Sequence, residues 1–268
     1  MRENAYGHHK RLEFIFSEIE RCLGQKELLK EEIKILDVGC GTGVMITLPL
    51  AAAGYNILGI DSDENSIKLA SKLNTFANAS FIHGSVENKD FENRFDIIIC
   101  SEVLEHQRDP YYFIRRLKGI LKNEGFLIVT IPNGYGLFEI DKFFWSLFTG
   151  IIPYFGEAVA AMERRVKKLL LYFPLKSEEE MEKNRPEIPS TLCFSKHYCK
   201  FTYSSITNLL RRLGLRIINF SNSTLWAGPF ADYFMRDLEK LIIFNSRIVD
   251  FLPRFLVSGW YFSCQRDK

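Results

Sequence analysis

Short apolar runs alternate with helical patterns along the first half of the chain. The runs are rich in branched apolar residues, which suit buried strands, and they cover residues 34–39, 56–61, 79–84, 94–100 and 126–132. The segments between them place apolar residues at helical spacing, over residues 43–53, 64–74 and 110–122. Strands separated by amphipathic helices predict an α/β fold with a parallel sheet and right-handed crossovers.

The regular alternation stops after Pro132. An aromatic-rich segment and the polar stretch KSEEEMEKNRPEIPS follow, which indicates a helical insertion over the carboxyl edge of the sheet, at residues 133–195. The pattern then resumes with a helix over 203–214, a strand over 215–220 and a last apolar run over 256–264. We therefore expect a Rossmann-like, doubly wound and mostly parallel seven-stranded sheet, with helices on both faces and the insertion after strand five.

Composition narrows the classes of function. The apolar fraction of 47% is ample for a packed core, and a formal net charge of +2 gives no global field that would recruit nucleic acid or an anionic membrane. The six cysteines contain no CxxC pair and no signal peptide opens the chain, so we expect a reducing, cytoplasmic setting. Cys193, His197 and Cys199 form the tightest group of metal-ligating types, but no second ligand pair follows at zinc spacing and we expect no metal.

A glycine turn follows the first predicted strand, in the stretch ILDVGCGTG at residues 35–43. A dinucleotide fold has the spacing GxGxxG, whereas Gly39, Gly41 and Gly43 give GxGxG. Asp37, just before the turn, would repel a pyrophosphate and favour a ligand that carries positive charge. S-adenosylmethionine has a sulfonium and an ammonium group and no phosphate, so the sequence favours this cofactor over a nicotinamide dinucleotide.

A second acid, Asp61 in GIDSDENS, ends the second predicted strand. A carboxylate at this place can accept two hydrogen bonds from a ribose diol. The alternative is an N-cap for the following helix, a role that Ser62 or Asp63 could also fill. The glycine turn and the acid support each other, and together they favour ribose binding.

Three stretches, ILDVGCGTG, GIDSDENS and RFDIIICSEVLEH, resemble the class I S-adenosylmethionine-dependent methyltransferases. The likeness is to the broad group that includes ubiquinone-pathway O-methyltransferases. It is good over about residues 33–132 and loose in the last helix and strands. It implies a leading helix and cofactor-binding half at 1–132, a helical insertion or lid at 133–195, and the rest of the domain at 196–268.

The same resemblance implies a set of cofactor contacts. The methionine end would lie against Asp37, Gly39, Cys40 and Gly41, the ribose against Asp61 with Ser62, the adenine against Ser85 and Val86, and the sulfur near Ser101 and Glu102. Many relatives have an acid where this chain has Ser85. The backbone amide of Val86 is therefore expected to take a larger share of the adenine contact.

Methyl transfer from a sulfonium requires mainly that an acceptor is aligned and water is excluded. A positioned base helps an oxygen acceptor, and His106 in EVLEH is the best candidate, with Glu105 and Glu102 as rival acids or supporting partners. The alternative is that His106 only packs the turn before Asp109 and Pro110. Transfer to oxygen is the leading interpretation; transfer to nitrogen or carbon, or a noncatalytic cofactor-binding partner protein, remain alternatives.

Nucleic acid is not an expected partner. Enzymes that methylate adenine amino groups resemble one another in an NPPY-like signature at the fourth strand, where this chain has CSEVLEH. There is also no separate basic domain with interleaved aromatic residues. The pairs Arg115 with Arg116 and Arg211 with Arg212 lie on predicted amphipathic helices, and we expect them to be solvated faces.

The segment 143–173 approaches membrane length, but Gly150, Pro153 and Gly156 interrupt it, so a spanning helix is not expected. Its second half has a basic amphipathic pattern, which can lie in a membrane interface or bind an anionic group. A lid with its own small core, or a homodimer contact, is the alternative. We therefore expect a small-molecule or lipid-linked acceptor, with peripheral membrane contact through 143–173 as a hypothesis.

The first residues, 3–19, read as an amphipathic helix. In many relatives of the family above such a helix covers the active site, so Tyr6 or His9 is a candidate contact to cofactor or acceptor. Packing on the sheet edge alone is the alternative.

Overall fold

The structure is a computed structural model of the whole chain. It describes residues 7–89, 91, 94–138, 140, 141, 143–147, 150, 197–229, 231, 235 and 238–267. Tyr6, Cys193 and most of the predicted insertion lie outside these residues, and so does most of the segment 143–173. No helix in the described part of the chain has both the length and the apolar character needed to cross a membrane.

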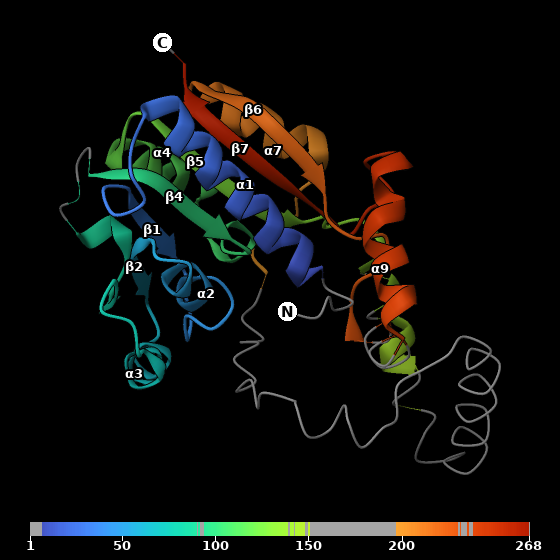
Figure 1. Cartoon of the computed structure of the whole chain (residues 1–268). Coiled ribbons are helices and arrows are strands. Elements are labelled where there is room, and N and C mark those ends of the chain that lie inside the picture. The colour runs from blue at the N-terminus through green and yellow to red at the C-terminus, as the bar shows by residue number, and fades with distance from the viewer. Residues whose placement is uncertain are drawn as a thin grey trace.

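Seven strands form one sheet in the order β3-β2-β1-β4-β5-β7-β6 (Figure 1). They are β1 (Lys34–Val38), β2 (Asn56–Asp61), β3 (Ala79–His83), β4 (Phe95–Ser101), β5 (Leu121–Pro132), β6 (Leu215–Asn222) and β7 (Gly259–Arg266). The first five pair in parallel, and β7 lies antiparallel to both β5 and β6. The predicted mostly parallel, seven-stranded Rossmann-like sheet is confirmed.

Helices cover both faces of this sheet (Figure 1). The helices α1 (His8–Lys26) and α2 (Thr47–Ala52) pack on one face, and α4 (Pro110–Ile120) and α7 (Tyr203–Arg212) pack on the other. The helix α3 (Glu64–Leu73) contacts β2 and β3, and α9 (Glu239–Arg247) lies beyond the end of the sheet (Figure 1). The helices follow from the sequence spacing and from their caps: the side chain of Asp109 accepts from the amide of Tyr112, and Pro110 takes the first helical position of α4.

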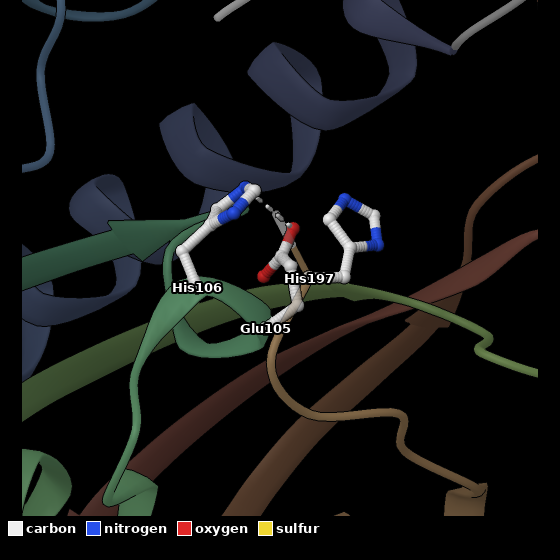
Figure 2. Close-up of side chains that lie close together, drawn as sticks. All are labelled: Glu105, His106 and His197. Carbon is white, nitrogen blue, oxygen red and sulfur yellow. Dashed lines mark ion pairs between the residues drawn. The ribbon is translucent and has the colours of Figure 1, made fainter. Parts of the chain in front are cut away.

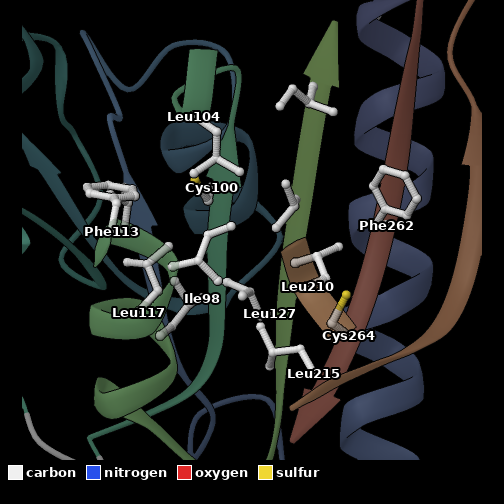
Figure 3. Close-up of a cluster of buried hydrophobic side chains, with 14 of the residues drawn as sticks. Ile98, Cys100, Leu104, Phe113, Leu117, Leu127, Leu210, Leu215, Phe262 and Cys264 are labelled. Atoms are coloured by element: carbon white, nitrogen blue, oxygen red, sulfur yellow. The ribbon is translucent and has the colours of Figure 1, made fainter. Parts of the chain in front are cut away.

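The strand pleat divides the core between the two faces. Ile97 and Ile99 of β4 pack with α1 and α2, whereas Ile98 and Cys100 point to the opposite face and pack with α4 and α7. Figure 3 shows the second cluster, in which Leu117 of α4 lies beside these β4 side chains. Burying a side chain of this size contributes about 1.5–3 kcal/mol to stability, so the two clusters hold the strand ends in place.

Two strand boundaries differ from those predicted. β5 begins at Leu121, which pairs with Phe95, so the expected extension of the preceding helix to residue 122 is wrong. Glu124 has a left-handed backbone (φ 60°) where the pairing register shifts. The last strand begins only at Gly259, where a Cβ atom would lie 2.7 Å from the Ile131 carbonyl oxygen, so glycine allows this close approach to β5.

The chain leaves the sheet after β5 and returns to it close to the same point. The amide of Gly134 donates to the carbonyl of Phe201 at 3.0 Å, and the amide of Asn133 donates to that of Ser258 at 2.8 Å. The two ends of the predicted insertion are therefore joined beside the carboxyl end of β5. The turns that follow β1, β2 and β4 lie at the same edge of the sheet, because parallel strands end together.

Candidate cofactor and active site

The glycine turn after β1 is fastened to the end of β2. The amides of Gly39 and Cys40 both donate to the carbonyl of Ile60, at 2.8 and 3.2 Å. Gly39 has a left-handed backbone (φ 70°), and a Cβ atom there would lie 2.5 Å from Cγ2 of Val103. Only glycine lets the turn pack this closely against the loop after β4. The packing links the predicted cofactor turn directly to the loop that carries Glu105 and His106.

Asp61 lies against this turn and does not cap the next helix. Its carboxylate accepts from the amides of Gly41 and Asp63, each at 2.8 Å. Asp63 is the N-cap of α3, and its side chain accepts from the amide of Ser66 at 2.9 Å. The capping alternative therefore belongs to Asp63. The nearby Ser62 is placed by a contact of 3.2 Å between its carbonyl and Nε2 of His83.

Asp37 is a buried acid directly behind the turn, with 2% of its surface exposed. The hydroxyl of Thr47 donates to its carboxylate at 2.6 Å. Burial raises the pKa of Asp37 to about 7, against the opposing effect of the Thr47 hydrogen bond and with a smaller contribution from the charge of Asp61. A ligand with positive charge would favour the ionised form of this carboxyl group.

A charged network joins α1 to the end of β4, and sequence reasoning missed its central residue, Arg11. One Arg11 nitrogen donates to the hydroxyl of Ser101 at 3.4 Å, and another lies 3.6 Å from Oε1 of Glu102. The Thr130 hydroxyl donates to the same Glu102 oxygen at 3.0 Å. Burial lowers the pKa of Arg11, but the charge of Glu102, the contacts with Tyr261 and the charge of Glu105 together outweigh this effect, and the pKa is raised overall.

Arg11 also keeps one donor free, because its buried Nε has no hydrogen-bond partner among the described residues. A buried donor of this kind is costly unless an acceptor reaches it. The sequence did contain a signal: Arg11 falls between the buried His8, Leu12 and Ile15 on the inward face of α1. A charged residue at a core-facing position of an amphipathic helix is a candidate for function.

Glu105 and His106, in the loop after β4, form a cluster with His197 (Figure 2). Each residue offers one ligand atom within 4.8 Å of the other two. Nε2 of His106 lies 3.9 Å from Oε1 of Glu105, and the two imidazole rings meet edge to face with centroids 4.9 Å apart. His197 comes from the far side of the insertion. It is held there because the amides of Tyr198 and Cys199 donate to the Glu105 carbonyl at 2.8 and 3.1 Å.

The Glu105 carboxyl group is buried, with 2% exposed, and its Oε2 has no hydrogen-bond partner among the described residues. Burial raises its pKa well above the usual range, and the charge of Glu102 adds to the effect. A nearby cation would favour its ionised form. One carboxylate with two imidazoles can therefore share a proton with a substrate, and it is also a donor set that suits a divalent metal ion.

Cys199 and His197, from the group that was expected to bind no metal, have different neighbours in the structure. The Cys199 thiol donates to the carbonyl of Gln107 at 3.3 Å, and His197 lies with Glu105 and His106 instead. No local spacing could have revealed this, since the insertion separates His197 from the other two residues. The expectation that the protein uses no metal stays a prediction.

The predicted adenine residues lie just after β3. Ser85 caps the short 3-10 helix Val86–Asn88, and its side chain accepts from the amide of Glu87. The Val86 side chain is buried in the core, and its carbonyl accepts from Nε of Arg116 at 3.1 Å. Arg116 is therefore a structural residue and not part of a solvated face. The adenine contact itself stays a prediction.

Comparisons with known proteins identify the family of this chain. The family model described as "Methyltransferase domain" matches residues 6–219. A ubiquinone biosynthesis O-methyltransferase from Rickettsia felis is 36% identical over 107 residues, which make up 38% of this chain and 42% of that protein. The chain spans 35 to 50% of the length of the curated relatives that it matches.

Solved structures share the fold over nearly the whole chain. A Galdieria sulphuraria protein described as a "putative sarcosine dimethylglycine methyltransferase" has a TM-score of 0.54 at 15% identity, covering 95% of this chain and 84% of that one. A Burkholderia thailandensis N1-methyltransferase with bound S-adenosylhomocysteine has a TM-score of 0.53 at 12% identity, covering 98% and 80%. These identities establish the fold alone. With the family match over most of its length, the chain belongs to the class I S-adenosylmethionine-dependent methyltransferase domains.

Proposed function

We propose that this protein transfers the methyl group of S-adenosylmethionine to a hydroxyl group of a small-molecule or lipid-linked acceptor. The observation that carries the proposal is the buried Glu105 carboxyl group beside the imidazoles of His106 and His197. This group can handle a proton, and its loop packs on Gly39 of the cofactor turn through Val103. The partial similarity to O-methyltransferases supports transfer to oxygen.

The residues around the turn suit the charges of the cofactor. Asp61 offers carboxylate oxygens for the ribose diol, and Asp37 offers negative charge for the ammonium and sulfonium groups. Arg11, which the sequence analysis did not include, offers a buried cationic donor for the cofactor carboxylate. Ser101 and Glu102 keep Arg11 at the end of β4, where the methyl-bearing sulfur is expected.

Methyl transfer is a displacement in which the acceptor oxygen attacks the methyl carbon and the sulfur leaves as a thioether. A hydroxyl acceptor must lose its proton, and in this proposal His106 accepts it while the ionised Glu105 stabilises the charged imidazole, a role that their distance of 3.9 Å supports. Excluding water from the site protects the sulfonium from competing attack. If the acceptor atom is nitrogen, a neutral amine can attack through its lone pair and the need for a base is weaker. If the acceptor atom is carbon, a C–H proton must be removed, and a base is needed at least as much as for a hydroxyl.

The test is transfer of a ¹³C-labelled methyl group to a panel of phenols, alcohols, amines and carbon acids, with products identified by NMR. We expect labelled O–CH₃ products, and a polyprenylated phenol can be compared directly with its water-soluble parent. Labelled N–CH₃ or C–CH₃ products would favour the alternative chemistries. Cofactor binding without transfer to any acceptor would favour a noncatalytic partner protein.

Contact with lipid is supported by exposed apolar side chains in the described part of the segment that follows β5. Phe143 and Leu147 are both exposed there. A dimer contact or a lid would use the same side chains. Preference for the polyprenylated acceptor only in the presence of vesicles would support lipid contact through 143–173.

The raised pKa of Asp37 leads to a prediction about cofactor affinity. In the free protein the carboxyl group is largely neutral below its pKa of about 7, and a cationic cofactor favours the ionised form, so binding releases a proton. Affinity for S-adenosylmethionine should therefore rise with pH from about 6 to 7.5, by at most about tenfold per pH unit, and then level off. Calorimetry on wild type and Asp37→Asn checks this, because titration of the cofactor itself is common to both. Equal pH profiles would contradict the role of Asp37.

A further inference from the structure

An open cavity lies at the edge of the sheet opposite the glycine turn. It has a volume of about 530 Å³, and its lining comes from α4 along its length, from the C-terminal end of α7 and from the end of β7: Tyr111, Arg115, Lys118, Gly119, Arg212, Leu213 and Arg266. Arg266 donates to the carbonyl of Leu121, the first residue of β5, so this edge carries the amino ends of the parallel strands. The cavity is thus separate from the methyl-transfer site.

Two of the four basic residues that line the cavity join its walls through hydrogen bonds. The ammonium of Lys118 donates to the Leu213 carbonyl at 2.6 Å, which joins α4 to the end of α7. Arg266 donates to the carbonyls of Lys118, Gly119 and Leu121, at the end of α4. These bonds satisfy carbonyls that a helix leaves free at its C-terminus.

The other two basic residues, Arg115 and Arg212, make no such bonds within the described part of the chain. Neither the Arg115 nor the Arg212 guanidinium has a hydrogen-bond or ion-pair partner among the described residues, and both side chains are exposed. Tyr111 also lines the cavity, with 47% of the residue exposed. Arg115, Arg211 and Arg212 are exposed, as expected for solvated faces, and Arg115 and Arg212 both line this cavity.

The four basic side chains that line the cavity carry more positive charge than the C-termini of α4 and α7 can offset. None of the residues that line the cavity is acidic. Two helix C-termini contribute roughly half a negative charge each, which balances about one of the four cations. Burial also lowers the pKa of Arg266. An anion in the cavity would therefore gain from all four groups.

We propose that this cavity is a binding site for a phosphate-bearing ligand, in which the Arg115 and Arg212 side chains clasp the phosphate and Lys118 and Arg266 supply supporting charge. Guanidinium groups match phosphate oxygens with paired donors, and the exposed Tyr111 ring offers a surface for the remainder of the ligand. The ligand is either a soluble phosphate ester or the headgroup of an anionic phospholipid. The proposal does not depend on which acceptor the protein methylates.

The test is calorimetric titration of the full chain with inorganic pyrophosphate at constant ionic strength. The Arg115→Gln, Arg212→Gln double variant should bind at least tenfold more weakly, since each charge-assisted bond is worth about a factor of ten or more. Arg211→Gln is the matched control, because Arg211 is the exposed neighbour of Arg212 on α7 and does not line the cavity. Unchanged affinity of the double variant for S-adenosylmethionine shows that the fold is intact.

A parallel sedimentation assay compares phosphatidylcholine vesicles with vesicles that also contain phosphatidic acid. Binding of pyrophosphate that the double variant loses identifies a soluble phosphate ligand. Binding only to phosphatidic acid vesicles, again lost in the double variant, identifies a lipid headgroup. The proposal is overturned if wild type binds neither probe at millimolar phosphate, or if the double variant and wild type bind equally well.

Discussion

Replacing Asp61 with alanine should weaken S-adenosylmethionine binding on the order of a hundredfold. Its carboxylate lies at the glycine turn, where it accepts from Gly41 and can accept from the ribose diol. Loss of two hydrogen bonds to a charged acceptor is worth about 3 kcal/mol or more, which corresponds to roughly that factor in affinity. The cofactor affinity of Asp61→Asn should lie between those of wild type and Asp61→Ala, because an amide oxygen replaces only one of the acceptors.

Thermal unfolding with and without the cofactor measures this change. Wild type at about a hundred times its dissociation constant should gain on the order of 2.7 kcal/mol, whereas Asp61→Ala should gain only a few tenths at the same concentration. Asp63→Ala is the matched control. It removes the cap of α3, which costs about 0.5–2 kcal/mol of stability, and should leave cofactor affinity unchanged. Equal stabilisation of wild type and Asp61→Ala by the cofactor would rule out the ribose contact.

Replacing His106 with alanine should lower kcat by about 10²- to 10⁴-fold, the usual contribution of a positioned general base. The side chain lies beside Glu105 and His197 in the loop that packs on the cofactor turn. It makes no part of the turn itself, so the affinity for S-adenosylmethionine should stay within twofold of wild type. Single-turnover methyl transfer, with cofactor binding measured separately, distinguishes these two effects. A kcat within twofold of wild type would remove His106 from the chemistry.

His197→Ala and Glu105→Gln identify how the cluster acts. If His106 acts as a base, His197→Ala should have a smaller effect than His106→Ala, and a chelator should leave wild type unchanged. If the three residues hold a divalent ion, the activity of His106→Ala, His197→Ala and Glu105→Gln should decrease to a similar extent. Activity should then be lost with a chelator and restored by added metal. The donor set of one carboxylate and two imidazoles is what makes this second outcome a real competitor.

The sheet could be predicted because its determinants are local. Strands such as β1 and β4 are short apolar runs bounded by turns, and that pattern needs no knowledge of the rest of the chain. The role of Asp61 was ambiguous, since three neighbouring side chains can all cap a helix. In the structure Asp63 caps α3, and the ribose contact of Asp61 stays a prediction.

The contacts of Arg11 and His197 could not be predicted in the same way, because their partners are distant in the sequence. The inward-facing position of Arg11 on its helix marks it as a candidate, but its partners Ser101 and Glu102 lie at the end of β4. The partners of His197, Glu105 and His106, lie in a loop on the other side of the insertion. The periodicity of a segment does not reveal which distant side chains it will meet.

The hydrogen bond between Gly134 and Phe201 fixes the two ends of the segment 135–200 to each other beside β5. Because these ends are already joined, a change in the length of the segment should cost little, about 0.6 kcal/mol for each doubling. The segment is not independent of the site, since His197 near its end lies with Glu105 and His106. We therefore expect that a different acceptor site could be grafted between the same two ends only if His197 is kept.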